Sequence, residues 1–288
     1  MNWLVYHIAS GHSFFTGVVL LVAAALCSIQ ARPVLRRFAG LSCLIGLIAV
    51  IVSSTPSPYW LIAGGTVVTV GWAVSFARGK NVRRWAIAMA AAWSLAGLIE
   101  LPYHFTRQLR PVPSRSLAVV GDSVTAGMGD GDTAERWPAI LSREQDLQVQ
   151  DLSHVGETAS SALRRIQGRP IDAQIVVVEI GGNDLLGSTT ADKFAEDLDA
   201  LLAHLAAPNR QLVMFELPLP PLSHAYGRAQ RTVAAKHQVV LIPKHEFLSV
   251  LAGSDSTLDT IHLSQDGHRR MADCVWRHVH TAFDSSQP

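Results

Sequence analysis

The feature that most constrains the fold is a series of apolar stretches in the first hundred residues. Four can be drawn, and none contains Lys, Arg, Asp or Glu except for Glu100 at the end of the last. They cover residues 3–29, 38–54, 60–77 and 85–101. A spanning helix needs about 17–25 mostly apolar residues, and lipid offers the backbone no other hydrogen-bond partner. Residues 1–101 are therefore predicted to form about four membrane-spanning helices.

Charge in the connections predicts the orientation of these helices. The basic residues of the first and third connections are Arg32, Arg36, Arg37, Arg78, Lys80, Arg83 and Arg84. The second connection, residues 55–58, carries no charge. Cytoplasmic loops are enriched in Lys and Arg, so the chain after residue 101 is predicted on the extracytoplasmic (periplasmic) side of a cell membrane. Three later basic residues, Arg107, Arg110 and Arg115, favour the opposite orientation. They are outnumbered by the seven basic residues of the first and third connections.

Overall composition narrows the possible partners. The net charge is only +1, which gives no indication of nucleic acid as a partner. Hydrophobic residues make up 49% of the chain and charged residues 16%, as expected for a protein in contact with membrane lipid. Two of the three cysteines, Cys27 and Cys43, lie in apolar stretches, which leaves Cys274 without a partner for an internal disulfide in the remaining chain. Nothing in the sequence indicates a protein partner or an oligomeric state.

After the apolar region the pattern changes to alternating strands and helices. Residues 102–115 contain three prolines among several arginines and are predicted to be a stiff, exposed connector. Strands are expected at residues 116–120, 147–152, 174–180, 211–217 and 239–242, and helices at 133–145, 159–166, 191–207, 223–237 and 265–282. Apolar strands separated by helices predict a parallel sheet covered on both faces, so residues 116–288 should form an α/β/α domain of about five parallel strands.

Four short blocks carry the residues with chemistry. GDSVTAG (121–127), SHVGET (153–158) and GGND (181–184) each follow a predicted strand, and DTIHLS (259–264) lies near the C-terminus. Ligands of parallel sheets bind beyond the carboxyl ends of the strands. A serine on a glycine-led turn at that edge is well placed as a nucleophile, provided that a base lies next to it. His154, in the second block, is predicted either to line the pocket or to lie on the surface.

These blocks, in this order and spacing, resemble the signature of the SGNH hydrolase family, also called GDSL-like. The resemblance covers residues 116–283. The compact thioesterase/lysophospholipase and arylesterase members of the family also contain the motifs GDS, GGND and DxxH. Here the first block reads GDSV rather than GDSL, and Leu263 stands where many relatives have proline. Neither side chain takes part in the chemistry. The resemblance implies a flavodoxin-like domain that needs no cofactor.

The resemblance also implies a catalytic triad of Ser123, Asp259 and His262. Ser123 would attack an acyl carbonyl, and His262 would take its proton and pass it to the leaving group. Asp259, three residues before His262, would hold the imidazole in the correct tautomer and stabilise its charged form. These three residues are the predicted catalytic groups.

The remaining family positions imply an oxyanion hole and its support. The predicted donors are the backbone N–H groups of Ser123 and Gly156 and the side-chain amide of Asn183. Asp122 is expected to support the site by hydrogen bonding, and Asp184 to organise its loop. No cluster of His, Cys or Asp in the sequence has the spacing of metal ligands, so the site is predicted to be metal-free.

The predicted function is a membrane-anchored serine hydrolase of acyl esters or thioesters. The substrate is expected to be a small molecule. Because the enzyme is predicted to be anchored in a membrane, a lipid or glycan acyl ester is favoured, such as a lysophospholipid or an acylated envelope glycan. A carbohydrate O-acetylesterase or an O-acyltransferase would use the same triad. A binding module with an inactive hydrolase domain is a non-enzymatic alternative, which the intact triad disfavours. Residues 128–136 and 217–227 are expected to shape the pocket, with residues 218–221 as an acyl-pocket wall.

Overall fold

The structure, a computed structural model, describes residues 2–128, 133–253, 255–259 and 261–284. The described chain forms two compact units. The helical unit contains Asn2–His104 and the short segment Leu219–His224. The α/β unit contains Phe105–Pro218 and the chain from Ala225 onward.

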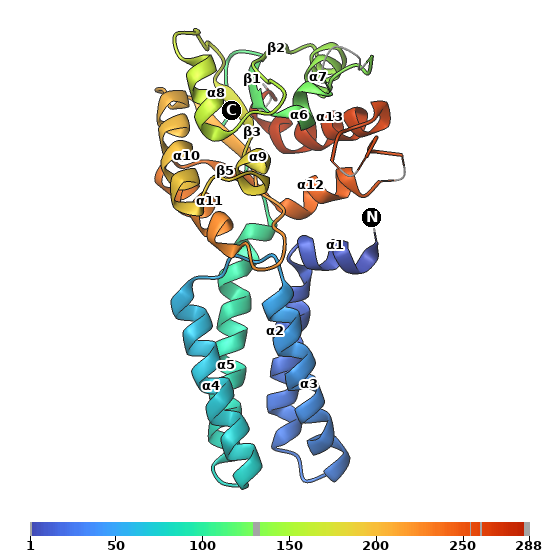
Figure 1. The fold of residues 1–288 in the computed structure, drawn as a ribbon, viewed down its shortest axis with the longest axis vertical. Helices are drawn as coiled ribbons and strands as arrows, with labels where there is room; N and C mark the ends of the chain where they lie inside the picture. Colours follow the sequence, from blue (N-terminus) through green and yellow to red (C-terminus); the bar gives the residue numbers. More distant parts are fainter. Residues whose placement is uncertain (1, 129–132, 254, 260, 285–288) are drawn as a thin grey trace. The chain divides into compact units, whose positions relative to one another are not determined.

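The helical unit consists of long apolar helices. In order they are α1 (Trp3–Ala9), α2 (His12–Ser28), α3 (Pro33–Val52), α4 (Tyr59–Arg78), α5 (Val82–Glu100) and the 3-10 turn η1 (Leu101–His104) (Figure 1). Three helices, α3, α4 and α5 with its 3-10 extension, are long and apolar enough to cross a membrane, or four if α1 and α2 count as one broken span. The predicted series of apolar N-terminal helices is confirmed.

The first apolar stretch, predicted as one helix over residues 3–29, is divided into two helices. α1 and α2 meet at an angle of 84°. Gly11 adopts a left-handed φ of 84° at the start of α2, a conformation that glycine reaches without a steric penalty. Residues 7–13 (HIASGHS) are more polar than the stretches on either side, so the sequence does mark the place of this turn.

Small residues and paired polar groups hold the helical unit together. A side chain at Gly17 of α2 would meet the carbonyl oxygen of Gly46 of α3 at 2.7 Å, so the two backbones approach closely. Trp72 Nε1 of α4 donates to Ser28 Oγ of α2 at 3.0 Å. Trp93 Nε1 of α5 likewise donates to a threonine hydroxyl of α4 at 2.9 Å.

The α/β unit is built on one parallel sheet. Its strands are β1 (Ser116–Gly121), β2 (Gln148–Asp151), β3 (Ile175–Glu179), β4 (Gln211–Phe215) and β5 (Val240–Ile242), in the order β2-β1-β3-β4-β5. All five match predicted strands, and the predicted fold class is confirmed. The chain leaves β1 toward one edge of the sheet and later returns to β3 on the other side. The point between β1 and β3, where strand order reverses, is where sheets of this kind bind ligands.

Helices cover both faces of the sheet, which makes a three-layer α/β/α unit. They are α6 (Ser123–Ala126), α7 (Trp137–Gln145), α8 (Ala159–Ile166), α9 (Gly182–Leu186), α10 (Ala191–Leu205), α11 (His224–Lys236), α12 (Lys244–Leu251) and α13 (Gln265–Val279), followed by the 3-10 turn η2 (His280–Ala282). Helices α8, α10 and α11 lie on one side, and α7, α12 and α13 on the other (Figure 1). Neighbouring β3 residues such as Val176 and Val177 are fully buried on opposite faces.

Two predictions need correction, the start of one helix and the exposure of the connector. The helix expected over residues 133–145 begins at Trp137, because Pro138 suits the first turn of a helix and interrupts any longer one. The connector is not exposed throughout. Leu109 is only 5% exposed and packs in the core of the α/β unit, and Val112 N donates to Ala282 O at 2.8 Å. The chain thus joins the core before the first strand begins.

Candidate active site

The candidate nucleophile lies where β1 turns into a short helix. β1 ends at Gly121, and Ser123 opens α6 with a side chain that is 8% exposed. Asp122 caps this helix, since its Oδ1 accepts a hydrogen bond from Val124 N at 2.9 Å. As the first residue of the helix, Ser123 has a backbone N–H with no acceptor within the helix itself. The turn therefore presents a hydroxyl and an N–H together.

Backbone hydrogen bonds bring the segments after β2 and β3 alongside this turn. His154 N donates to Gly121 O at 3.0 Å, and Asp122 N donates to Glu179 O at 3.2 Å. Gly156 follows with a left-handed φ of 77°, and a Cβ at this position would meet nothing within 4 Å. The Gly156 backbone is thus open to a ligand. Of the two placements predicted for His154, the structure shows the surface one, with a side chain 64% exposed.

Asn183 connects these segments. Its Nδ2 donates to Glu157 O at 3.0 Å and to Asp122 Oδ2 at 3.2 Å. Asp184 lies beside it, fully buried, and its Oδ2 accepts from Ala159 N at 3.0 Å, which ties α9 to the start of α8. Burial raises the pKa of Asp184. The blocks that follow β1, β2 and β3 therefore form one hydrogen-bonded group.

Asp259 and His262 form a second group. His262 Nδ1 lies 2.7 Å from Asp259 Oδ2. Asp259 Oδ1 accepts from Ile261 N at 2.7 Å and from His262 N at 2.9 Å. The bond from His262, followed by these two backbone bonds, lowers the pKa of Asp259, so its carboxylate is ionised and Nδ1 is the donor. The other ring nitrogen, Nε2, is then left to accept a proton.

Trp137 joins α6, which begins at Ser123, to α13, which follows the His262 loop. Trp137 Nε1 donates to Thr125 Oγ1 of α6 at 3.2 Å, and Trp137 N donates to His268 Nδ1 of α13 at 3.4 Å. Within the described residues Ser123 and His262 share no hydrogen bond. Such bonds are often long in unliganded enzymes and tighten when substrate binds.

A buried carboxyl pair beneath the nucleophile was not predicted. Glu179, the last residue of β3, accepts from Thr125 Oγ1 at 3.0 Å and from Asp122 N at 3.3 Å through Oε2. Burial, followed by the charge of Asp122, raises the pKa of Glu179 well above its ordinary value. Burial also raises the pKa of Asp122 to about 6. Both shifts favour the protonated form of this pair. The sequence feature that could have indicated this pair is the acidic residue at the end of a valine-rich strand.

A second unpredicted acid holds the segment around Gly156. Glu157 is 4% exposed, and its Oε1 accepts from Arg165 Nε at 2.6 Å. Its Oε2 accepts from Ser161 Oγ at 2.6 Å. Arg165 also donates to Leu152 O, at the end of β2. This buried ion pair anchors the loop that presents the Gly156 backbone.

Away from this edge, Glu246, Cys274 and His278 bring potential ligand atoms within 4.8 Å of one another. The spacing of these residues in the sequence did not predict that cluster. Its chemistry does not favour a cation. Arg277 already pairs with Glu246 at 3.3 Å, and burial raises the pKa of Cys274 to about 12, so the thiol stays protonated.

The arrangement at the β1/β3 edge leads to the comparison with known proteins. The GDSL-like lipase/acylhydrolase family matches residues 119–270, which is more than half of the chain. The chain belongs to this family. As a GDSL-like, or SGNH, enzyme it is a hydrolase that acts on esters. The predicted family membership and enzyme class are confirmed.

Relatives of this GDSL-like chain agree with that assignment. Esterase TesA of Pseudomonas aeruginosa is 28% identical over 177 residues, which cover 57% of this chain and 87% of TesA. A protein of Escherichia coli strain K12 named thioesterase 1/protease 1/lysophospholipase L1 is 26% identical over 184 residues, 60% of this chain and 88% of that one. A crystal structure of esterase EstA from Pseudoalteromonas sp., inhibited by monoethylphosphonate, matches with a TM-score of 0.50 at 21% identity, covering 57% and 96%. At this identity the EstA structure shows the shared fold alone.

Proposed function

We propose that the chain is a membrane-anchored serine hydrolase that cleaves acyl esters or thioesters with Ser123, His262 and Asp259 as its catalytic triad. The observation that carries the proposal is the distance of 2.7 Å between His262 Nδ1 and the carboxylate of Asp259, whose pKa this bond lowers, in a chain of the GDSL-like family. An imidazole held by a carboxylate in this way is a general base for a hydroxyl.

The proposed reaction proceeds in two halves. Ser123 Oγ attacks the acyl carbonyl carbon while His262 Nε2 takes the hydroxyl proton, and the tetrahedral intermediate collapses as His262 gives that proton to the leaving alcohol or thiol. Water then attacks the acyl-serine ester, again with His262 as base, and releases a carboxylic acid. Asp259 keeps the imidazole oriented and stabilises its charged form in both halves.

The proposed oxyanion hole is formed by Ser123 N–H, Gly156 N–H and Asn183 Nδ2. One well-placed donor lowers the barrier by about 2.7–4 kcal/mol. In the free enzyme the Asn183 amide donates to Asp122 and to Glu157 O. The oxyanion would replace one of these acceptors, which requires only a small rotation of a group that is already oriented toward the site. Asp122 thus positions the amide without contacting substrate.

Membrane anchoring supports a lipid-derived substrate. Helices α3, α4 and α5 have the length and apolar character of spans. We assign the helices up to residue 101 to the anchor and residues 116–288 to the catalytic domain, on the extracytoplasmic side that the basic connections indicate. The thioesterase and lysophospholipase names of the Escherichia coli relative favour acyl thioesters and lysophospholipids. A carbohydrate O-acetylesterase and an O-acyltransferase remain the competing assignments.

A fluorophosphonate probe tests the triad on the full-length chain in detergent. We expect labelling of the wild type, its complete loss in Ser123→Ala and strong loss in His262→Ala. Ser153→Ala, a serine near the end of β2, is the matched control and should label normally. Equal labelling of Ser123→Ala would refute the assignment. A series of p-nitrophenyl esters from acetate to palmitate then separates an O-acetylesterase, which prefers acetate, from a lipid hydrolase, which prefers longer chains.

A further inference from the structure

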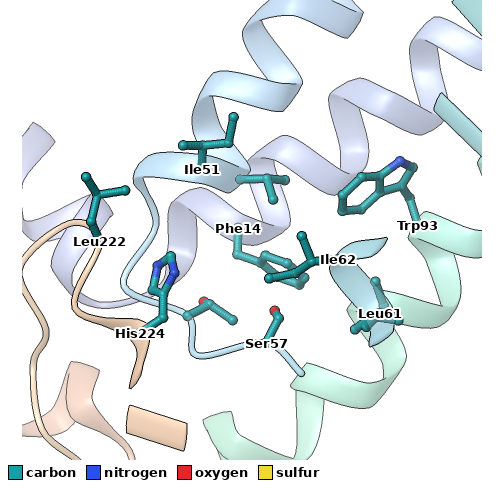
Figure 2. A pocket seen from close by; sticks show the side chains of 11 residues that line it. Phe14, Ile51, Ser57, Leu61, Ile62, Trp93, Leu222 and His224 are labelled. Carbon is teal, nitrogen blue, oxygen red and sulfur yellow. The ribbon is translucent and has the colours of Figure 1, made fainter. Parts of the chain in front are cut away.

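The helical unit contains an apolar pocket of about 210 Å³. Figure 2 shows Phe14 of α2, Ile51 of α3, Ile62 of α4 and Trp93 of α5 around it. α3 ends, α4 begins and α5 ends close to these residues in the chain, so the pocket lies at the end of the bundle that has no basic connection. Its volume exceeds that of an engineered apolar cavity of roughly 150 Å³ that binds benzene.

A segment from between β4 and α11 completes the pocket wall. Leu219–His224 packs as part of the helical unit, and Leu222 and His224 both line the pocket (Figure 2). His224 Nε2 donates to Ser53 O at 2.6 Å, which fastens the segment to the end of α3. Leu222 has a left-handed φ of 70° and a side chain that is 78% exposed. Strain of this kind at a non-glycine residue persists where the surroundings hold it, often at ligand sites.

The chemistry of the lining selects the occupant. Its eleven residues include no Asp, Glu, Lys or Arg. Apolar cavities exclude water, and an unfilled one forfeits the van der Waals contacts of its walls. A flexible hydrocarbon chain restores those contacts, whereas a charged or sugar-like ligand would lose its hydration without compensation. At one side of the pocket Ser57 and His224 supply polar atoms that suit an ester or a headgroup (Figure 2).

The surroundings of the pocket supply such a chain. Apolar side chains on the outer faces of the bundle are exposed, including Ile48 at 52%, Val67 at 64% and Leu98 at 65%. Under the proposed membrane anchoring these faces contact lipid. We infer that the pocket binds one acyl chain of a membrane lipid, with the polar end of the lipid near Ser57 and His224. The inference rests on the membrane anchoring and is independent of the Ser123 chemistry.

Photo-crosslinking of the full-length protein in detergent tests this site. The probe is a lysophosphatidylcholine with a diazirine at the middle of its acyl chain, and mass spectrometry locates the labelled peptides. We expect labels on the pocket residues Phe14 and Ile62, and competition by unlabelled lysophosphatidylcholine. Ala96→Phe, which fills the pocket from α5, should reduce these labels roughly tenfold, equivalent to about 1.4 kcal/mol. Ala91→Phe, on the exposed face of the same helix, should not.

Further variants keep the test decisive. Leu222→Gly removes an exposed side chain at a φ that suits glycine, so it should fold normally and still weaken pocket labelling by a factor of about three. Ser123→Ala should label in the pocket as the wild type does. Normal pocket labelling of a wild-type chain that shows no esterase activity would refute the proposed triad and leave the acyl-chain site standing. Labelling spread evenly over the bundle, or unchanged in both Ala96→Phe and Leu222→Gly, would overturn the acyl-chain site.

Discussion

Two buried glutamates lie at the carboxyl edge of the sheet. Replacing one of them by glutamine should lower the stability of the protein strongly, whereas the same substitution of the other should change it little. Glu179 ends β3 and is 6% exposed, and Glu216 follows β4 and is 2% exposed. Burial would raise the pKa of Glu216, but the charges of Lys244 and Arg231 outweigh it and lower that pKa. Arg231 Nη2 lies 2.7 Å and Lys244 Nζ 3.4 Å from Glu216 Oε1. We therefore expect Glu216 to be ionised and Glu179 to be protonated at pH 7.

The magnitudes follow from these charge states. Glu216→Gln leaves two buried cations without a full counter-charge, which costs about 3–5 kcal/mol. At about 2–4 °C per kcal/mol for a unit of this size, the Tm should fall by roughly 10 °C. Glu179→Gln exchanges a neutral acid for a neutral amide of the same shape and keeps an oxygen acceptor for Thr125 Oγ1. We expect a change within about 1 kcal/mol at pH 7.

The pH dependence separates the two residues further. The pKa of Glu179 is raised in the folded protein, so the folded state retains a proton that the unfolded state releases above pH 4.5, and stability falls as pH rises through this window. The pKa of Asp122 is also raised, from 3.8 to about 6, so the two carboxyls titrate as a pair and act in the same direction. In Glu179→Gln the contribution of Glu179 disappears. The penalty of Glu216→Gln instead shrinks as pH falls and the wild-type carboxylate is protonated.

Thermal unfolding of the full-length chain in detergent, followed by near-ultraviolet circular dichroism from pH 5 to pH 9, measures both effects. Glu179→Gln should gain stability relative to the wild type as pH rises. If Glu179→Gln lost as much stability at pH 7 as Glu216→Gln does, Glu179 would have to be ionised. That result would refute the hypothesis that Glu179 is protonated.

Three further outcomes are expected. Asp259→Asn should lower kcat for p-nitrophenyl esters by about 10⁴-fold with little change in Tm, because the amide no longer holds the Nδ1–H tautomer; an unchanged kcat would remove Asp259 from the triad. Gly156→Ala should cost about 1 kcal/mol in thermal unfolding, since its φ of 77° disfavours a side chain although space is open; a loss above 3 kcal/mol would mean that the site is closed. Gly17→Ala should destabilise the helical unit by about 1–3 kcal/mol against the Gly46 backbone, whereas Gly40→Ala, with nothing within 4 Å, should not; equal melting of the two variants would contradict the close approach of α2 and α3.

The composition of the strands was enough to predict the fold of the α/β unit. A valine-rich run such as residues 174–180 is apolar on both faces, which is typical of a strand in a parallel sheet covered by helices. The polar blocks directly after three of these strands then predicted a site at one edge, because the carboxyl ends of parallel strands lie together. Regular local patterns of this kind depend only on neighbouring residues. They are readable without coordinates.

Charge states at the site were not readable in this way. Glu179 and Asp122 are 57 positions apart, and they influence each other's pKa only because β1 and β3 pair in a register that places Gly121 opposite Glu179. The ion pair between Glu157 and Arg165 likewise depends on the burial of both groups. A pKa depends on desolvation and on neighbours brought in by folding, so spacing along the chain does not predict it.

By itself the sequence determined the two-part character of this protein, its parallel α/β sheet and the hydrolase signature, since each follows from residue type and local order. Tertiary structure alone decided the turn at Gly11, the burial of Leu109, the raised pKa of Glu179 and the place of Leu219–His224 in the helical unit. Each of these depends on contacts between segments far apart in the chain. Such contacts are selected by packing and desolvation energies that exist only once the whole chain has folded.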